Sequence, residues 1–230
     1  MPMLTLIQND PEVPSGNLLG WFREYQIPCR VARPYSGEVL PAIADNTALI
    51  ILGGAMGVHD ASRYPFLLAV RSYIQQAINR EVPLLGICLG GQLLADVLGA
   101  PVHSQRNGER GLHPVEVLKS ADTDPLFLGI PRFFNTFQWH NDSFEIPADA
   151  VCLASSPACA HQAFRYGVNH FGLQFHPEVT RSIVTSWIES SAGVNDTTRI
   201  MEEFIRAEKA YAAISRKLLE NFLRIAHVLR

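Results

Sequence analysis

The chain has 230 residues, of which 47% are hydrophobic and 18% are charged, and its formal net charge is -3. This composition is typical of a globular protein with a large buried interior and excludes a disordered chain. The slight acidic excess provides no basic field for a nucleic acid, and no apolar run approaches the roughly 20 residues that span a bilayer. We therefore expect a single domain over 1–230, with neither nucleic acid nor membrane as a partner.

The N-terminal segment and the cysteines indicate the cellular compartment. The apolar run at 4–8 has no cationic flank and is soon interrupted by Asp10, so it predicts a strand and not a signal peptide. The four cysteines Cys29, Cys88, Cys152 and Cys159 are widely scattered and form no C-x-x-C pair, which favours reduced thiols over disulfides or zinc. We expect a soluble, cytoplasmic protein.

The first hundred residues alternate strand patterns with helix patterns. Strands are expected at 4–8, 29–33, 48–52 and 83–87, and helices at 17–25, 65–80 and 89–98. Such alternation is typical of right-handed βαβ units, so it predicts an α/β fold built on a parallel sheet.

The pattern changes in the second half of the chain. Apolar runs at 115–118, 132–137, 151–154, 162–165 and 170–175 are separated by clusters of Pro, Gly, Asp and Asn. These runs predict hairpins or meandering strands added to the sheet. After Gly193 there is neither Gly nor Pro, and apolar residues recur three or four apart from Ile200 to Leu229. This predicts an amphipathic helical tail from about residue 197, continuous or broken once, that covers either its own sheet or a partner.

Cys88 lies in the frame Gly86-Ile87-Cys88-Leu89-Gly90, between a buried-strand pattern and the start of a helix pattern. The same frame with serine is the nucleophile elbow of the α/β-hydrolases, in which a sharp turn exposes the side chain above the sheet. The helix N-terminus would favour a thiolate there. Cys88 is therefore a candidate nucleophile. The alternative is a small buried hydrophobic residue.

His176 and Glu178 end another apolar run, in the segment Gln174-Phe175-His176-Pro177-Glu178. A cysteine nucleophile needs a base, and the base needs a group that orients it, so this pair supplies both functions. A His-x-Glu pair alone is a weak signal, because such residues are commonly exposed polar groups at a strand end. Its weight comes from its combination with the elbow at Cys88.

A third motif is the Gly53-Gly54 turn, which directly follows the β-branched run at 49–52. Backbone N–H groups in such a turn, together with the N–H after the nucleophile, can form an oxyanion hole. The alternative is an ordinary turn between a strand and a helix. The glycine spacings of phosphate-binding and dinucleotide-binding loops do not occur, so these glycines do not predict a nucleotide site.

In this order, the three motifs resemble the class I (triad) glutamine amidotransferases, in particular stand-alone proteins similar to the amidotransferase domain of GMP synthase. The resemblance extends from the first strand to about Val179. It implies a three-layer α/β fold of the flavodoxin-like type with a mostly parallel sheet. It also implies that Cys88 forms a γ-glutamyl thioester, that His176 transfers protons and that Glu178 orients the imidazole. The family chemistry needs no cofactor.

The resemblance assigns further residues around the nucleophile. The oxyanion donors would be the backbone N–H groups of Gly54 and Leu89. The glutamyl-binding residues would be Gln92, Asn141 and Asp142, and Gln92 lies on the same helix face as the cysteine four residues earlier.

Two positions depart from the family pattern. Gly91 and Ala55 are smaller than the residues often found there, so we expect extra space beside the nucleophile. His140 and Asp142 give only a weak metal signal, because two ligands without a third do not make a zinc site. We expect no metal.

These observations predict a glutamine amidotransferase or glutaminase that releases ammonia from glutamine. Ammonia would pass to a separate synthetase subunit, or the chain would act alone as a hydrolase. One alternative is a γ-glutamyl peptidase or hydrolase that uses the same triad on another γ-glutamyl amide. A second alternative is a catalytically silent binding or regulatory protein.

Overall fold

The computed structural model describes residues 3–190 and 196–229, and its central element in these residues is a nine-stranded sheet. The strand order is β2-β1-β3-β4-β11-β10-β9-β6-β7. The strands are β1 (Met3–Ile7), β2 (Cys29–Ala32), β3 (Asn46–Ile51), β4 (Leu84–Ile87), β6 (Glu109–Val117), β7 (Phe133–His140), β9 (Ala150–Ser155), β10 (Ala163–Tyr166) and β11 (His170–Leu173). Pairings from β2 across to β11 are parallel, and those from β11 to β7 are antiparallel. The expected parallel sheet with added hairpin strands is confirmed.

The helices are α1 (Leu18–Glu24), α2 (Phe66–Asn79), α3 (Leu89–Val97), α4 (Arg181–Ser190) and α5 (Thr197–Ile225). The first three agree with the sequence prediction to within one residue at each end. Helix α4 was not predicted, and neither was the small antiparallel pair of β5 (Val102–His103) with β8 (Ser143–Phe144). Neither α5 nor any other described helix is both long and apolar enough to cross a membrane.

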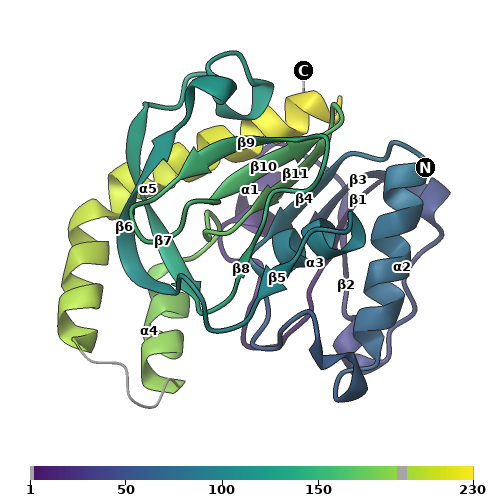
Figure 1. The fold of residues 1–230 in the computed structure, drawn as a ribbon, viewed down its shortest axis with the longest axis horizontal. Coiled ribbons are helices and arrows are strands. Elements are labelled where there is room, and N and C mark those ends of the chain that lie inside the picture. The colour runs from purple at the N-terminus through teal and green to yellow at the C-terminus, as the bar shows by residue number, and fades with distance from the viewer. Residues whose placement is uncertain (1–2, 191–195, 230) are drawn as a thin grey trace.

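The helices cover both faces of the sheet (Figure 1). Successive side chains of a strand point to opposite faces, so Leu49 and Ile51 pack with α2 and α3, while Ile50 packs with α1 and α5. Strands that are covered on both sides must be apolar along their whole length, which explains the continuous hydrophobic run in β3. The three-layer α/β fold is confirmed.

Helix α5 is a continuous helix of 29 residues, without the break that the sequence left open. Its buried side chains include Phe204, Tyr211, Leu218 and Phe222, spaced so that they lie along one side of the helix. Leu218 and Phe222 belong to the core cluster on one face of the sheet, and Phe204 and Tyr211 belong to the cluster around α4. The apolar side of the helix therefore covers this chain's own sheet.

The parallel strands place their carboxyl ends at one edge of the sheet. Ile51 of β3 pairs with Gly86 of β4, and Gly86 pairs with Gly172 of β11. The segments that follow these three strands consequently start side by side. In open α/β sheets this edge is where ligands bind.

Candidate active site

Cys88 occupies the turn between β4 and α3, with φ 50° and ψ -109°. Few L-residues adopt such a conformation, and it is characteristic of a strained strand-to-helix elbow. The flanking glycines are required by close packing: a Cβ atom at Gly86 would lie 2.4 Å from the Gly90 carbonyl oxygen, and one at Gly90 would lie 2.1 Å from that of Ile51. The Cys88 N–H donates to the Leu173 carbonyl over 2.8 Å, which fixes the turn to β11.

His176 and Glu178 form a buried pair, with 2.7 Å between His176 Nδ1 and Glu178 Oε1. The side chains are only 3% and 1% exposed. Burial alone lowers the pKa of His176, but the Glu178 carboxylate and the Cys88 sulfur outweigh this effect and raise the pKa to about 10. Because Nδ1 is hydrogen-bonded to the Glu178 carboxylate, Nε2 is the ring nitrogen available to exchange a proton with the Cys88 thiol.

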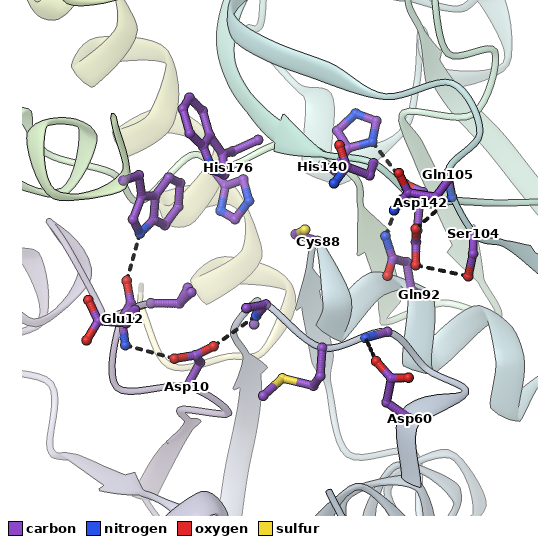
Figure 2. Close-up of a pocket in the computed structure, with 18 of the residues that line it drawn as sticks. Asp10, Glu12, Asp60, Cys88, Gln92, Ser104, Gln105, His140, Asp142 and His176 are labelled. Carbon is purple, nitrogen blue, oxygen red and sulfur yellow. Dashed lines mark hydrogen bonds between the residues drawn. The ribbon is translucent and has the colours of Figure 1, made fainter. Parts of the chain in front are cut away.

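Gly53 lies between the nucleophile and the imidazole. A Cβ atom at this position would be 3.1 Å from His176 Cε1 and 3.4 Å from Cys88 Cβ. The absence of a side chain therefore leaves room for His176 and Cys88 to face each other in one cavity (Figure 2). The structure thus brings together the three residues predicted as a triad.

Gly54 lines the cavity together with Cys88, and Leu89 directly follows Cys88; the backbone N–H of neither residue donates a hydrogen bond to another described residue. The neighbouring Ala55 N–H is occupied, since it donates to Asp10 Oδ2 over 2.9 Å. Side chains would crowd this turn, because a Cβ atom at Gly54 would lie 2.5 Å from Met56 Sδ. Two uncommitted donors beside a nucleophile are the arrangement that stabilises an oxyanion.

Gln92 lies one helical turn beyond Cys88, and its side-chain amide is tied to two neighbouring segments. Its Nε2 donates to the Asp142 carbonyl over 3.2 Å and to Gln174 Oε1 over 3.4 Å. Gln174 in turn directs its own Nε2 toward Cys88 Sγ at 3.9 Å. Gln174 was not predicted as a site residue. Its position just before His176 at a strand end was the signal that could have found it.

His140 is itself part of the cavity lining. Its Nδ1 donates to the Asp142 carbonyl over 2.9 Å, and its Nε2 lies 3.3 Å from the buried Glu109 Oε2. Both ring nitrogens are thus engaged with protein acceptors. Among the described residues, no group of three or more His, Cys, Asp or Glu side chains is arranged to hold a metal ion.

Asn141 and Asp142 both line the cavity. The Asp142 carboxylate accepts from the Gln105 N–H over 2.9 Å, and Asn141 Oδ1 accepts from Arg110 over 3.3 Å. The segment after β7 is therefore held from its backbone and from its side chains. Gln92 and Asp142 lie on the side of Cys88 away from His176 (Figure 2), and Asn141 lines the same cavity.

The cavity has a volume of about 580 Å³. Several of its lining residues were not found by sequence reasoning: Asp10, Glu12, Val13, Met56, His59, Asp60, Ser104, Gln105, Arg110, Trp187 and Ser190. Asp10 follows the first parallel strand, so its position was a usable signal. Trp187 lies on the unpredicted helix α4, and nothing in the local sequence marks it.

Gly91 does not open space beside the nucleophile, so that expectation was wrong. A Cβ atom at Gly91 would lie 2.7 Å from the Leu173 carbonyl oxygen, which means that this side of α3 faces β11 and not the cavity. The glycine permits close packing of helix on sheet. Ala55, in contrast, does line the cavity.

The other three cysteines are free thiols at a distance from the cavity lining. Burial raises the pKa of Cys29 and of Cys159 to about 11, and it raises the pKa of Cys152 as well. Since the thiolate is the reactive form, these three residues are poor nucleophiles.

Comparison with known proteins identifies the family. Residues 15–189 match the model of the class-I glutamine amidotransferases. The chain is 30% identical over 181 residues to the glutamine amidotransferase-like protein YfeJ of Salmonella typhimurium, covering 77% of this chain and 76% of that protein. It is 36% identical over 135 residues to a subunit of the glutamine-hydrolyzing GMP synthase of Methanocaldococcus jannaschii, covering 58% of this chain and 65% of that protein.

Solved structures extend the similarity to nearly the whole chain. A glutamine amidotransferase from Thermotoga maritima superposes with a TM-score of 0.88 at 32% identity, covering 98% of both chains. A glutamine amidotransferase from Methylobacillus flagellatus, 24% identical with a TM-score of 0.87, shares the fold over 97% of this chain and 94% of that one. The chain therefore belongs to the class I glutamine amidotransferase family, as its motifs indicated.

Proposed function

We propose that this protein hydrolyses the side-chain amide of glutamine through a γ-glutamyl thioester on Cys88. The observation that carries the proposal is the buried His176–Glu178 pair facing a cysteine held on a strained elbow. A positively charged imidazole beside the sulfur stabilises the thiolate, which is the nucleophilic form.

The reaction follows from the positions of these groups. The thiolate attacks the carboxamide carbon, and the carbonyl oxygen takes the negative charge close to the N–H groups of Gly54 and Leu89. When the C–N bond breaks, its electron pair goes to nitrogen, which accepts a proton from His176 and leaves as ammonia. A water molecule, deprotonated by His176, then attacks the thioester. Glutamate is released and the Cys88 thiolate is restored.

The glutamyl part of the substrate is proposed to lie along the wall formed by Gln92, Asn141 and Asp142. The Asp142 carboxylate would accept from the α-amino group of the substrate. The Gln92 side-chain amide donates to the backbone carbonyl of Asp142. Since both groups are fixed by hydrogen bonds before a substrate arrives, little rearrangement is needed on binding.

A γ-glutamyl peptidase or hydrolase is the second candidate. The cavity of about 580 Å³ falls within the roughly 300–1,000 Å³ of typical small-molecule sites and continues past His176 to Glu12 and Trp187. A leaving group larger than ammonia would have space there. Ala55 contributes to this space, whereas Gly91 does not.

A third candidate is a silent binding protein, and the complete triad geometry speaks against it.

The fate of the ammonia is a separate question. Because the relatives include glutamine-hydrolyzing GMP synthases that are divided into subunits, we propose that a separate synthetase subunit can receive it. The chain aligns with about half to two thirds of three such relatives, at 65%, 52% and 54% of their lengths.

The test is to measure ammonia and glutamate side by side, for glutamine and for a panel of γ-glutamyl amines. Cys88→Ala is compared with Cys159→Ala, which removes a buried thiol outside the cavity. We expect slow glutaminase activity, comparable or faster turnover of some γ-glutamyl amide, and loss of both only in Cys88→Ala. Fast turnover of glutamine alone would exclude the hydrolase. Turnover of no substrate, together with an unreactive Cys88, would favour the silent protein.

A further inference from the structure

The tail helix α5 reaches the catalytic segment through one side chain. The Tyr211 hydroxyl donates a hydrogen bond of 2.8 Å to the backbone carbonyl of His176. Tyr211 is only 2% exposed, so no water competes for this bond. The helix lies outside residues 15–189, the stretch that matches the family model.

This bond completes the fixation of the His176 backbone. The N–H of His176 already donates to the Phe137 carbonyl of β7 over 2.8 Å. The next residue, Pro177, has no N–H to donate, and the pairing of this segment with β7 is a single isolated bridge between Phe137 and His176. Tyr211 adds a side-chain donor to the His176 carbonyl, which also faces Phe137 in an antiparallel bridge, and both sides of the residue are then anchored.

Aromatic rings hold the imidazole itself. The Trp187 ring of α4 meets the His176 ring edge to face, with 4.9 Å between centroids. Phe204 of α5 packs on Phe137 at 5.6 Å and on Tyr211 at 5.3 Å. Helix α4 thus contacts the imidazole directly, and α5 packs on the residues that hold the His176 backbone.

We propose that Tyr211 is a positioning residue, which holds His176 in line with Cys88 through the backbone carbonyl. The proposal rests on the proposed function of His176 as the base. The hydroxyl is a dependable donor, because burial raises the pKa of Tyr211 well above its usual value and keeps it protonated. Loss of the hydroxyl leaves the ring packing intact but removes one of the contacts that fix the His176 carbonyl, so the imidazole samples orientations that do not face the sulfur.

The test compares Tyr211→Phe with Tyr25→Phe. The Tyr25 hydroxyl also anchors α5, through a 2.5 Å hydrogen bond to Glu220, but at a site away from the cavity. We expect Tyr211→Phe to lower kcat about tenfold with KM unchanged, because the variant loses one hydrogen bond that positions the base. Tyr25→Phe should leave kcat unchanged. Thermal unfolding of both variants shows that the comparison is made on folded protein.

A second measurement does not depend on turnover. The rate at which iodoacetamide alkylates Cys88 at neutral pH reports how well the imidazole stabilises the thiolate. We expect this alkylation rate to be lower in Tyr211→Phe than in the wild type and unchanged in Tyr25→Phe. The comparison holds even if the wild type hydrolyses no amide. Equal alkylation rates in the wild type and Tyr211→Phe would overturn the proposal, and so would an equal loss in both variants.

Discussion

Oε1 of Glu178 lies 2.7 Å from Nδ1 of His176, with only Pro177 between the two residues. The chain bends at Pro177 and Glu178, beyond the end of β11, and the bend brings the two side chains together. Glu178 Oε2 has no hydrogen-bond partner among the described residues, which leaves the carboxylate committed to the imidazole alone.

This arrangement predicts the order of effects in the triad. Cys88→Ala and His176→Ala should each lower kcat on the order of a thousandfold or more, because the members of a triad act as a unit. Glu178→Gln should cost less, since an amide oxygen can still accept from Nδ1. Steady-state kinetics on one substrate are sufficient. The assigned roles would be wrong if Glu178→Gln were more damaging than Cys88→Ala.

Cys88 should be the one cysteine labelled by an electrophilic glutamine analogue such as a γ-diazoketone. Burial raises the pKa of Cys29, Cys152 and Cys159, so their thiols stay protonated at neutral pH. Peptide mapping by mass spectrometry identifies the labelled residue. Labelling that persists unchanged in Cys88→Ala would contradict the assignment, and Cys159→Ala provides the control.

The His176–Glu178 pair should make stability depend on pH. The pKa of His176 is raised from 6.5 to about 10 in the folded protein, so the folded state binds this proton more tightly than the unfolded chain. The resulting stabilisation is complete below about pH 6.5 and is lost as pH rises through about 10. Urea unfolding across this window should show a smaller decline in His176→Asn than in the wild type. His227→Asn, at an exposed position, should decline like the wild type.

Two glycine substitutions should separate activity from folding. Gly53→Ala places a methyl group 3.1 Å from His176 Cε1, so we expect reduced kcat at a modest cost in stability. Gly90→Ala places one 2.1 Å from the Ile51 carbonyl oxygen, where backbone must move, and overpacking of this kind typically costs about 1–3 kcal/mol or more. Parallel assays of kcat and unfolding free energy test the contrast. The predicted contrast would be contradicted if Gly53→Ala had a lower unfolding free energy than Gly90→Ala.

The sequence predicted the parts of the fold that follow from local periodicity. Strands β1 to β4 are rich in apolar residues, and α1 to α3 have clear boundaries. Helix α4 was missed because Ile183, Val184 and Thr185 are β-branched residues that favour strands as much as helices.

In the site, too, the residues marked by a local sequence pattern were found, and those placed only by packing were not. Cys88, His176 and Gly54 each follow a strand, so local motifs were enough to find them. Trp187 and Tyr211 reach His176 only through the packing of α4 and α5, and no local pattern records such a contact. Gly91 was misjudged for the same reason, since only the packed structure shows which side of α3 faces β11.

The loop that carries His176 is also held from the first part of the chain. The Asn17 N–H donates to the Glu178 carbonyl over 2.8 Å, and Asn17 Nδ2 donates to the Val179 carbonyl over 3.1 Å, across 162 residues of sequence. Contacts between such distant segments form late, because their loop-closure entropy must be overcome first. During synthesis, Tyr211 must leave the ribosome before the loop that carries His176 is held by both Asn17 and Tyr211. We therefore expect a nascent chain to acquire its folded sheet before it acquires a reactive thiol.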